Sequence, residues 1–264
     1  MILSIANNNP IDNAKEATQK NNDAALLEQA NVIYSYWYQE HQLGKTTDPD
    51  DAEEYVRNKL QEQGFEDYEH IRIGKKTGEV RYSYLPTNYT ELEYLESTGT
   101  QYIDTGVNAD NKLGFDCKVY YGSGRFGAWN YKDNQNHRHH MYVNGGWGFG
   151  LGDANYGTYH PKGDIYSIQC NYLNNYLYKE NNIELSKLPK NDFDTAQNFW
   201  LFSRNPSISF MGRIYYFRIT YEDTLVRNFI PAKNLSGTIG MYDIVNYVFY
   251  TNAGEGEFVA GDEI

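Results

Sequence analysis

The first third of the chain is patterned with the period of an α-helix. After Pro10, apolar residues recur at three- and four-residue spacing, and no Gly or Pro interrupts them before Gly44. This pattern predicts one long helix of about thirty residues, a rod of ~45 Å. A second helix is predicted from Asp48, where Pro49 and a run of acids favour a helix start, to the residue before Gly64.

The pattern changes to a period of two near residue 70. Residues 70–73 (His-Ile-Arg-Ile) and 79–84 (Glu-Val-Arg-Tyr-Ser-Tyr) flank a glycine-bounded turn, which predicts a β-hairpin. Residues 86–90 resemble a short linker, so we predict one domain over residues 1–86 and a second over 87–264. In the second, short strand-like runs separated by Gly, Asn and Asp indicate an antiparallel sandwich or barrel; the clearest runs are 101–105, 113–121, 125–131, 140–143, 165–173 and 198–203.

The most regular alternation runs from residue 212 to residue 253. Ile214 shares its parity with Tyr216, and the residues between and after them, such as Phe217, form the opposite face. A turn is predicted at Glu222 and Asp223, and a second tight return at Asp243. These strands would close a large antiparallel sheet that displays a surface.

Composition narrows the classes of function. A net charge of −12 argues against nucleic-acid binding, which needs clustered Lys and Arg. The 26 tyrosines suit both sheet faces and recognition surfaces. Cys117 and Cys170 both lie in strand-like runs and are interpreted as buried thiols, with a single cross-strand bridge as the alternative. The apolar residues 1–6 are interpreted as the end of a hydrophobic segment, the one route by which the protein would reach a membrane.

Four motifs occur in order along the second domain. They are Leu92-Glu-Tyr-Leu-Glu-Ser-Thr-Gly-Thr-Gln-Tyr-Ile-Asp-Thr-Gly106, Phe202-Ser-Arg-Asn205, Leu225-Val-Arg-Asn-Phe-Ile-Pro-Ala232, and Ile239-Gly-Met-Tyr-Asp243 with Phe249-Tyr-Thr-Asn-Ala-Gly254. Together they resemble the laminin-G-like, concanavalin-type jelly-roll modules of bacterial surface proteins and prophage tail proteins. The resemblance implies a mainly β protein, with a jelly-roll sandwich over residues 91–264 that binds sugars or proteins.

The first domain carries a different resemblance. Residues 4–17 (Ser-Ile-Ala-Asn-Asn-Asn-Pro-Ile-Asp-Asn-Ala-Lys-Glu-Ala) are similar to the stretch that follows the membrane helix in pilin-like proteins of Gram-positive gut bacteria. A long helix, a loop and a small sheet also form the layout of type IV pilins and pseudopilins. The resemblance implies a missing leader and half-helix, and contacts with other pilin subunits through the N-terminal helix. The alternative is an amphipathic helix packed on a hairpin, without that role.

A carboxylate triplet opens the second domain. Glu91, Glu93 and Glu96 resemble the E-x-D-x-x-E strand of laminarinase-like glycoside hydrolases, whose retaining chemistry needs two carboxyl groups ~5.5 Å apart. On a regular strand Glu96 has the opposite parity from the other two. Acids that keep an edge strand from pairing with other chains explain the triplet more simply.

The histidines and aspartates of the second domain are candidate metal ligands. His139 and His140 are adjacent, so on a strand they point to opposite faces, and we interpret residues 132–138 as a solvated loop leading into that strand. His137 and His160 complete the histidine group. Calcium is a better candidate than zinc, because laminin-G-like modules often carry a rim site of aspartates; the available residues are Asp104, Asp110 and Asp153.

Aromatic residues beside glycines are the remaining candidates for a site. Sugar rings stack on exposed aromatic faces, while amide and guanidinium groups bond their hydroxyls, so the predicted ligand-binding residues are Arg125, Trp129, Asn130, Tyr131 and Trp147. The alternative is that such aromatics fill the sandwich core, as we expect for the Trp in Phe-Trp-Leu-Phe at 199–202.

These observations favour a non-enzymatic, extracellular cell-surface protein without a cofactor. A pilin-like stalk would present a sandwich that binds a glycan or a host surface protein. The alternative is a phage tail or virion protein that binds the host cell. A third hypothesis, a β-glucan-type glycoside hydrolase, depends on the carboxylate triplet.

Overall fold

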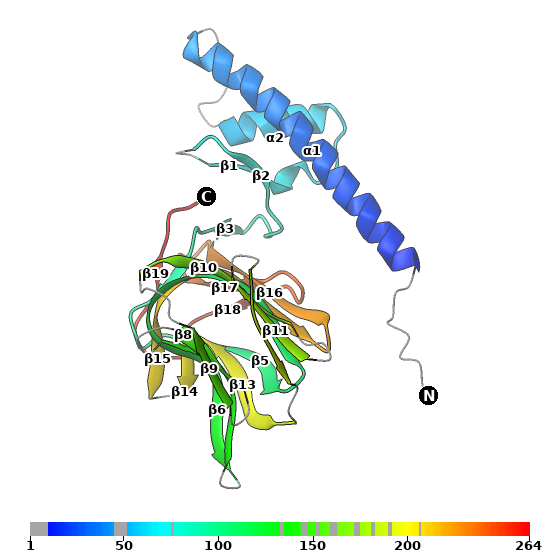
Figure 1. Cartoon of the computed structure of the whole chain (residues 1–264). Coiled ribbons are helices and arrows are strands. Elements are labelled where there is room, and N and C mark those ends of the chain that lie inside the picture. The colour runs from blue at the N-terminus through cyan, green and yellow to red at the C-terminus, as the bar shows by residue number, and fades with distance from the viewer. Residues whose placement is uncertain are drawn as a thin grey trace. The chain divides into compact units, whose positions relative to one another are not determined.

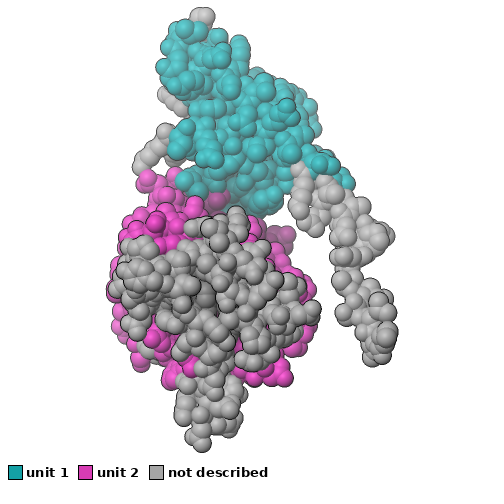
Figure 2. Space-filling model, viewed as in Figure 1, with its two compact units in different colours: residues 1–87, 264 teal, residues 88–263 magenta. Residues whose placement is uncertain are grey.

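The computed structural model describes residues 10–44, 52–74, 77–132, 135–143, 147–151, 154–158, 163–171, 175–180, 183–189, 192–205 and 207–264. They form two compact units (Figure 2): one comprises the described residues up to Thr87 together with Ile264, and the other comprises those from Asn88 to Glu263. Each unit has its own cluster of buried apolar side chains.

The first unit is built on the long helix α1 (Pro10–Gln42), beside the shorter helix α2 (Ala52–Glu62) (Figure 1). One stripe of α1 is buried because its apolar residues recur at spacings of four, three and four. Gly44 follows the helix with φ of +62°, a conformation that suits glycine. The predicted start of the second helix, at Asp48 and Pro49, lies outside the described residues. The buried side chains of the two helices are Leu26, Ala30, Ile33, Trp37, Tyr55, Val56 and Leu60.

Polar side chains fix α2 to a small hairpin of β1 (Ile71–Ile73) and β2 (Val80–Tyr82), which follows a 3₁₀ turn at Tyr68–His70. Glu53 accepts a hydrogen bond from the Ile73 N–H at 2.8 Å. Arg57 donates two bonds to the Ile71 carbonyl, at 2.9 and 2.8 Å. The hairpin lies where the sequence predicts it. Among the described residues, neither helix has the length and apolar character needed to span a membrane.

The second unit consists almost entirely of antiparallel strands arranged as a sandwich (Figure 1). Its strands are β3 (Tyr89–Glu91), β4 (Leu95–Ser97), β5 (Ile103–Asp110), β6 (Leu113–Lys132), β7 (Gln135–Val143), β8 (Trp147–Leu151), β9 (Ala154–Thr158), β10 (Ile165–Asn171), β11 (Asn175–Glu180), β12 (Ile183–Pro189), β13 (Asp194–Leu201), β14 (Ser203–Asn205), β15 (Ile208–Tyr221), β16 (Thr224–Asn234), β17 (Ile239–Asp243), β18 (Val248–Tyr250) and β19 (Val259–Ala260).

The two halves of the long strand β6 pair with different strands. Its first half pairs with β10 on one side and β15 on the other. Its second half pairs with β7 and meets β13 where Gly127 lies opposite Trp200. The sequence predicts two strands here, and the structure joins them into one.

A bulge at glycine allows β6 to change faces. Before it, odd-numbered residues such as Phe115 are buried; after it, even-numbered residues such as Phe126 are buried. Gly124 has φ of +96°, and a Cβ there would lie 1.9 Å from the Ser209 carbonyl oxygen. Only glycine fits such a position. The extra residue of the bulge is Gly122, because the register of β6 against β15 shifts between Tyr121 and Ser123.

The predicted parity of β15 is wrong at its centre. Ile214 is fully buried together with Phe217 and Ile219, whereas Tyr216 is only half-buried. The register against β6 shifts between Ile214 and Tyr216, because an extra residue is accommodated there. The predicted turn at Glu222 and Asp223 is confirmed.

The two thiols are buried, as predicted. Cys117 lies opposite Ile168, and Cys170 lies opposite Phe115, two pairs further along the same ladder of β6 and β10. No disulfide joins the two cysteines. Burial raises the pKa of the Cys117 thiol well above its ordinary value, which makes it an apolar filler of the core.

Candidate functional site

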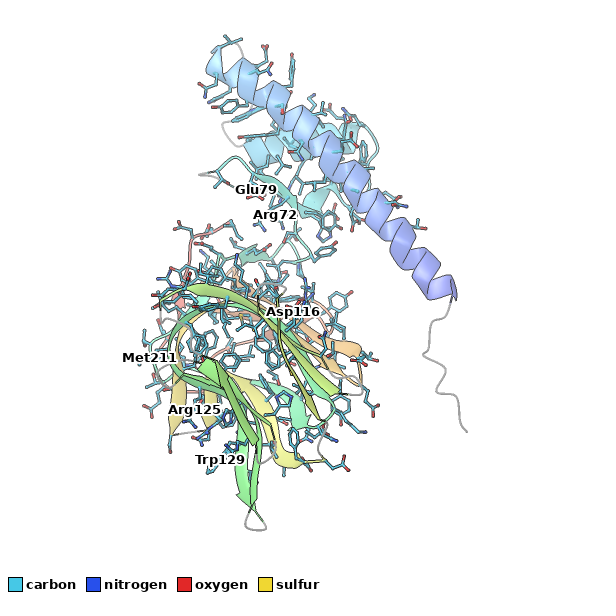
Figure 3. The ribbon with its side chains drawn as sticks, in the orientation of Figure 1. Arg72, Glu79, Asp116, Arg125, Trp129 and Met211 are labelled. Carbon is cyan, nitrogen blue, oxygen red and sulfur yellow. The ribbon has the colours of Figure 1, made fainter. Side chains whose placement is uncertain are left out.

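The β6–β7 hairpin presents a row of large polar and aromatic side chains on the face away from the core. Phe126 and Ala128 are fully buried, so the alternating residues Arg125 and Trp129 lie on the opposite face of β6. Both are half-buried and follow one another along the strand (Figure 3). The hairpin register brings β7 residues beside them, with Arg138 opposite Trp129.

The structure corrects the interpretation of residues 132–138 as a solvated loop. Strand β7 begins at Gln135, so Arg138 lies in a ladder with β6. His140 lies opposite Gly127 on the same face as Arg138 and Trp129. Sequence alone missed this because a polar run of Asn, Gln, His and Arg has low intrinsic strand propensity.

A third strand contributes to this face. The guanidinium of Arg204, on β14, lies over the ring of Trp129 at 4.9 Å from its centroid. Arg204 is only 5% exposed. The chain reaches β14 through Phe202, a fully buried residue with φ of +63° that separates β13 from β14. The contact is a cation–π pair in partly desolvated surroundings.

Gln197 links the two sides of this pair. Its side-chain nitrogen donates to the Arg204 carbonyl at 2.8 Å, and its side-chain oxygen accepts from the backbone N–H of Trp129 at 3.5 Å. Gln197 sits in an irregular part of β13, where Thr195 bonds the backbone of Gln197. The side chain therefore acts as a positioning residue for both Trp129 and Arg204.

Glycine flanks His140 on both neighbouring strands. Gly127 of β6 and Gly150 of β8 are its cross-strand partners. Gly127 has φ of +122°, and a Cβ there would lie 2.7 Å from the His140 Cα. The close approach of β6 and β7 at this point therefore requires glycine. Trp200 continues the row from β13, half-buried and stacked on Tyr102 at 4.3 Å. The expectation that this tryptophan fills the core is wrong.

The charges on this face act on one another. Burial lowers the pKa of His140 well below its ordinary value, and Arg204, Arg125 and Arg138 lower it further. Burial lowers the pKa of Arg204 to about 10, again with contributions from Arg125 and Arg138. At neutral pH the histidine is neutral and the three arginines are charged. We call these four residues and Trp129 the basic–aromatic face.

His139 lies on the other side of β7, in the core. Its Nε2 is 2.8 Å from the Leu113 carbonyl oxygen, and Phe115, Phe193 and Phe199 surround the ring. Burial lowers its pKa to about 4. The prediction that adjacent histidines point to opposite faces is confirmed, so these two do not converge on one zinc ion. His160 and the side chain of His137 lie outside the described residues.

The structure brings two of the five predicted ligand-binding residues onto one face, Arg125 and Trp129. Asn130 is half-buried and has the opposite parity, at the position paired with residue 137. Tyr131 and Trp147 have positions in β6 and β8, but their side chains lie outside the described part of the structure. Arg138, His140, Arg204 and Gln197 were not among the predicted residues.

The aspartates weighed for calcium do not converge. Asp104 and Asp110 lie at opposite ends of β5, about 20 Å apart for six residues of extended chain. Asp104 accepts bonds from the Gly106 N–H and the Asn198 amide, both at 2.9 Å. Asp110 accepts the Tyr221 hydroxyl at 2.6 Å. Asp153 lies outside the described residues. These carboxylates bond to the chain itself and do not fit a shared calcium site.

One acidic cluster with a histidine occurs among the described residues of the first unit. Asp67, Glu69 and His70 each have a potential ligand atom within 4.8 Å of the others. Asp67 is exposed, and the His70 Nδ1 lies 2.9 Å from the Ser83 carbonyl oxygen. Exposed acids of this kind are common on protein surfaces without a metal.

The carboxylate triplet is not carried by a single strand. Glu91 ends β3, Glu93 lies between strands and Glu96 belongs to β4. Glu96 forms an ion pair with Arg213 at 2.7 Å, and that guanidinium lies over the ring of Tyr94. The resemblance to a hydrolase strand therefore fails at the level of local structure.

No protein-family model matches the chain, and no curated protein is significantly similar to it. Function is therefore inferred from the geometry of the site rather than from relatives.

Proposed function

We propose that the protein is a non-enzymatic cell-surface adhesin whose sandwich, a laminin-G-like jelly roll, binds a glycan. The observation that carries the proposal is the half-buried Trp129 ring, held against Arg204 and placed in line with Arg125 on the same strand. A flat aromatic surface beside fixed hydrogen-bond donors suits a sugar ring and its hydroxyl groups.

The chemistry of this face favours binding over catalysis. Arginine stays protonated across the physiological range, and tryptophan has no group that titrates. The remaining member, His140, is 2% exposed and its pKa is lowered, so it is poorly placed to exchange protons with a substrate. Such a set orients a ligand through hydrogen bonds and apolar contact.

The first unit would carry the sandwich in a pilin-like arrangement. We base this on the resemblance of residues 4–17 and on the long helix α1, which begins within that range at Pro10. Val32 and Tyr36 on α1 and Leu43 just after its end are exposed, four and seven residues apart, and would contact the helices of neighbouring subunits. A host-cell-binding protein of a virion would use the same sandwich with a different attachment.

A binding screen of the full chain on immobilised glycans tests the main proposal. We expect Trp129→Ala to bind the same glycans about tenfold more weakly than the unchanged protein, because aromatic and cation–π contacts contribute about 1–2 kcal/mol. The matched control is Tyr215→Ala. Tyr215 is a half-buried strand aromatic of the same unit, and the Lys118 Nζ lies over its ring, 5.0 Å from the centroid.

Tyr215→Ala should bind as the unchanged protein does. If no glycan binds the correctly folded protein, or if both variants lose binding equally, the proposal is wrong.

A further inference from the structure

The basic–aromatic face concentrates positive charge in an acidic protein. The chain has a net charge of −12, yet three arginines surround the single histidine at the centre of this face. Arg138 is two residues from His140 on β7, a same-face separation of about 6.7 Å. Arg125 lies diagonally across the β6–β7 ladder from His140, a separation of about 7–8 Å.

The fourth group, Arg204, reaches the same place from β14. The charges that contribute to its lowered pKa come from Arg125 and Arg138, so both lie within electrostatic range of Arg204. Among the described residues, its Nε is buried without a hydrogen-bond partner. Like charges brought together in partly desolvated surroundings repel one another, and the same positive potential attracts an anion.

The chemistry of the guanidinium group suits an anion on this face. Guanidinium groups present planar forks of N–H donors that match the two oxygens of a carboxylate or the oxygens of a sulfate ester. Trp129 would meanwhile offer its ring to the apolar side of a sugar. Arg125 and Arg138 are half-buried, so their side chains remain accessible while Arg204 forms the buried base.

We propose that the basic–aromatic face recognises the acidic group of an anionic glycan, that is, a sugar bearing a carboxylate or a sulfate ester. The inference rests on the proposed glycan-binding function and specifies the class of ligand. A nucleic acid is a poorer fit, because a polyanion needs a longer basic surface than three arginines on a chain of net charge −12.

The first experiment compares acidic glycans with their neutral parents. The full chain is applied to an array in which each neutral glycan stands beside its sialylated, uronate-bearing and sulfated counterparts. We expect binding to acidic members at least tenfold stronger than to their neutral parents, and weaker binding as salt is raised from 50 to 500 mM, about a threefold change in screening length. The sialylated, uronate and sulfated arms tell carboxylate from sulfate recognition.

The second experiment removes one charge at a time. With the strongest acidic glycan as the probe, Arg125→Gln should lower affinity about tenfold or more, since it removes a charge-assisted hydrogen bond. Arg125→Lys keeps the charge but loses the planar fork of donors, so its affinity should lie between those of the unchanged protein and Arg125→Gln. Arg138→Gln gives a second, independent position.

The matched control is Arg218→Gln. Arg218 is a half-exposed strand arginine of the same unit, 3.3 Å from Asp116, and its loss changes the net charge equally. Its affinity should stay within twofold of the unchanged protein. Far-ultraviolet circular dichroism and the melting temperature of each variant establish that it is folded.

The outcomes separate the two proposals. Equal binding of acidic and neutral glycans, or equal losses in Arg125→Gln and Arg218→Gln, would overturn the anion specificity and leave glycan binding intact. Absence of binding to every glycan by the folded protein would overturn the proposed function and this inference with it.

Discussion

At the scale of single residues, His139 and His140 show how a one-residue step on a strand separates two environments. His139 packs among phenylalanines and bonds to the Leu113 carbonyl, whereas His140 lies beneath arginines. The sequence predicted the opposite faces from the period of two. It could not predict the burial of either ring, because burial depends on strands that lie far away in the chain.

The buried His139 should make stability depend on pH. Its pKa is about 4 in the folded protein, against about 6.5 for an unfolded histidine. Between these values the unfolded chain binds more protons than the folded protein. The stabilising contribution of neutral His139 is therefore fully present above pH ~6.5 and is lost as pH decreases towards 4. This difference in pKa corresponds to about 3 kcal/mol of unfolding free energy.

Denaturant unfolding of the unchanged protein and of His139→Gln at pH 7.5 and pH 5 measures this effect. We expect the unchanged protein to lose about 2 kcal/mol more than the variant over this interval, because the variant cannot take up the proton there. An equal loss in both proteins would show that His139 does not govern the dependence.

At the scale of secondary-structure elements, β6 explains why the sequence predicted two strands where one exists. The apolar parity of residues 113–121 is the reverse of that at 125–131, and a reversed parity normally indicates separate strands. Here the glycine bulge reverses the parity within one continuous strand. The hairpin tip at residues 222–223 was predictable because its turn signal is local.

The candidate site was predictable only where its residues lie close together in the sequence. Arg125 and Trp129 lie in one strongly patterned strand, so their common face follows from parity. Arg204 reaches Trp129 from a strand seventy-five residues later in the chain, through a left-handed turn at Phe202. Gln197 acts through an amide contact that no spacing rule encodes.

Gly124→Ala tests the close approach of β6 to β15 next to the bulge. The substitution forces a left-handed conformation on alanine and places its Cβ 1.9 Å from a backbone oxygen, so we expect a loss of about 2–4 kcal/mol in unfolding free energy. The matched control is Gly237→Ala, at φ of +85° with nothing within 4 Å, which should lose about 1–2 kcal/mol. Thermal unfolding followed by circular dichroism measures both. Losses of the same size would mean that the close approach at β15 does not constrain β6.

At the scale of the whole molecule, the change of hydrophobic period along the chain corresponds to two separate clusters of buried side chains. One cluster uses residues from Leu26 to Val80, and the other uses residues from Leu95 to Phe258. Because the clusters share no residue, a surface change on α1 should leave the sandwich intact.

This separation allows the proposed subunit contact to be tested on its own. We expect Tyr36→Glu, which places a charge on the exposed strip of α1, to weaken self-association at least tenfold in sedimentation experiments, because the charge would have to be buried. Gln39→Glu, an exposed position on the same helix with no apolar side chain to lose, is the control. Glycan binding should be unchanged in both. A protein that is monomeric at all concentrations would contradict the pilin-like assembly.

The continuity of β6 has a mechanical consequence. A ligand that pulls on Arg125 and Trp129 loads the second half of the strand, and the backbone transmits that load into the first half. There β6 is hydrogen-bonded on both sides, to β10 and to β15. A pull along the strand direction would shear many of these bonds at once instead of breaking them one by one. Tension on the bound ligand would thus be borne by a strand that is paired on both sides.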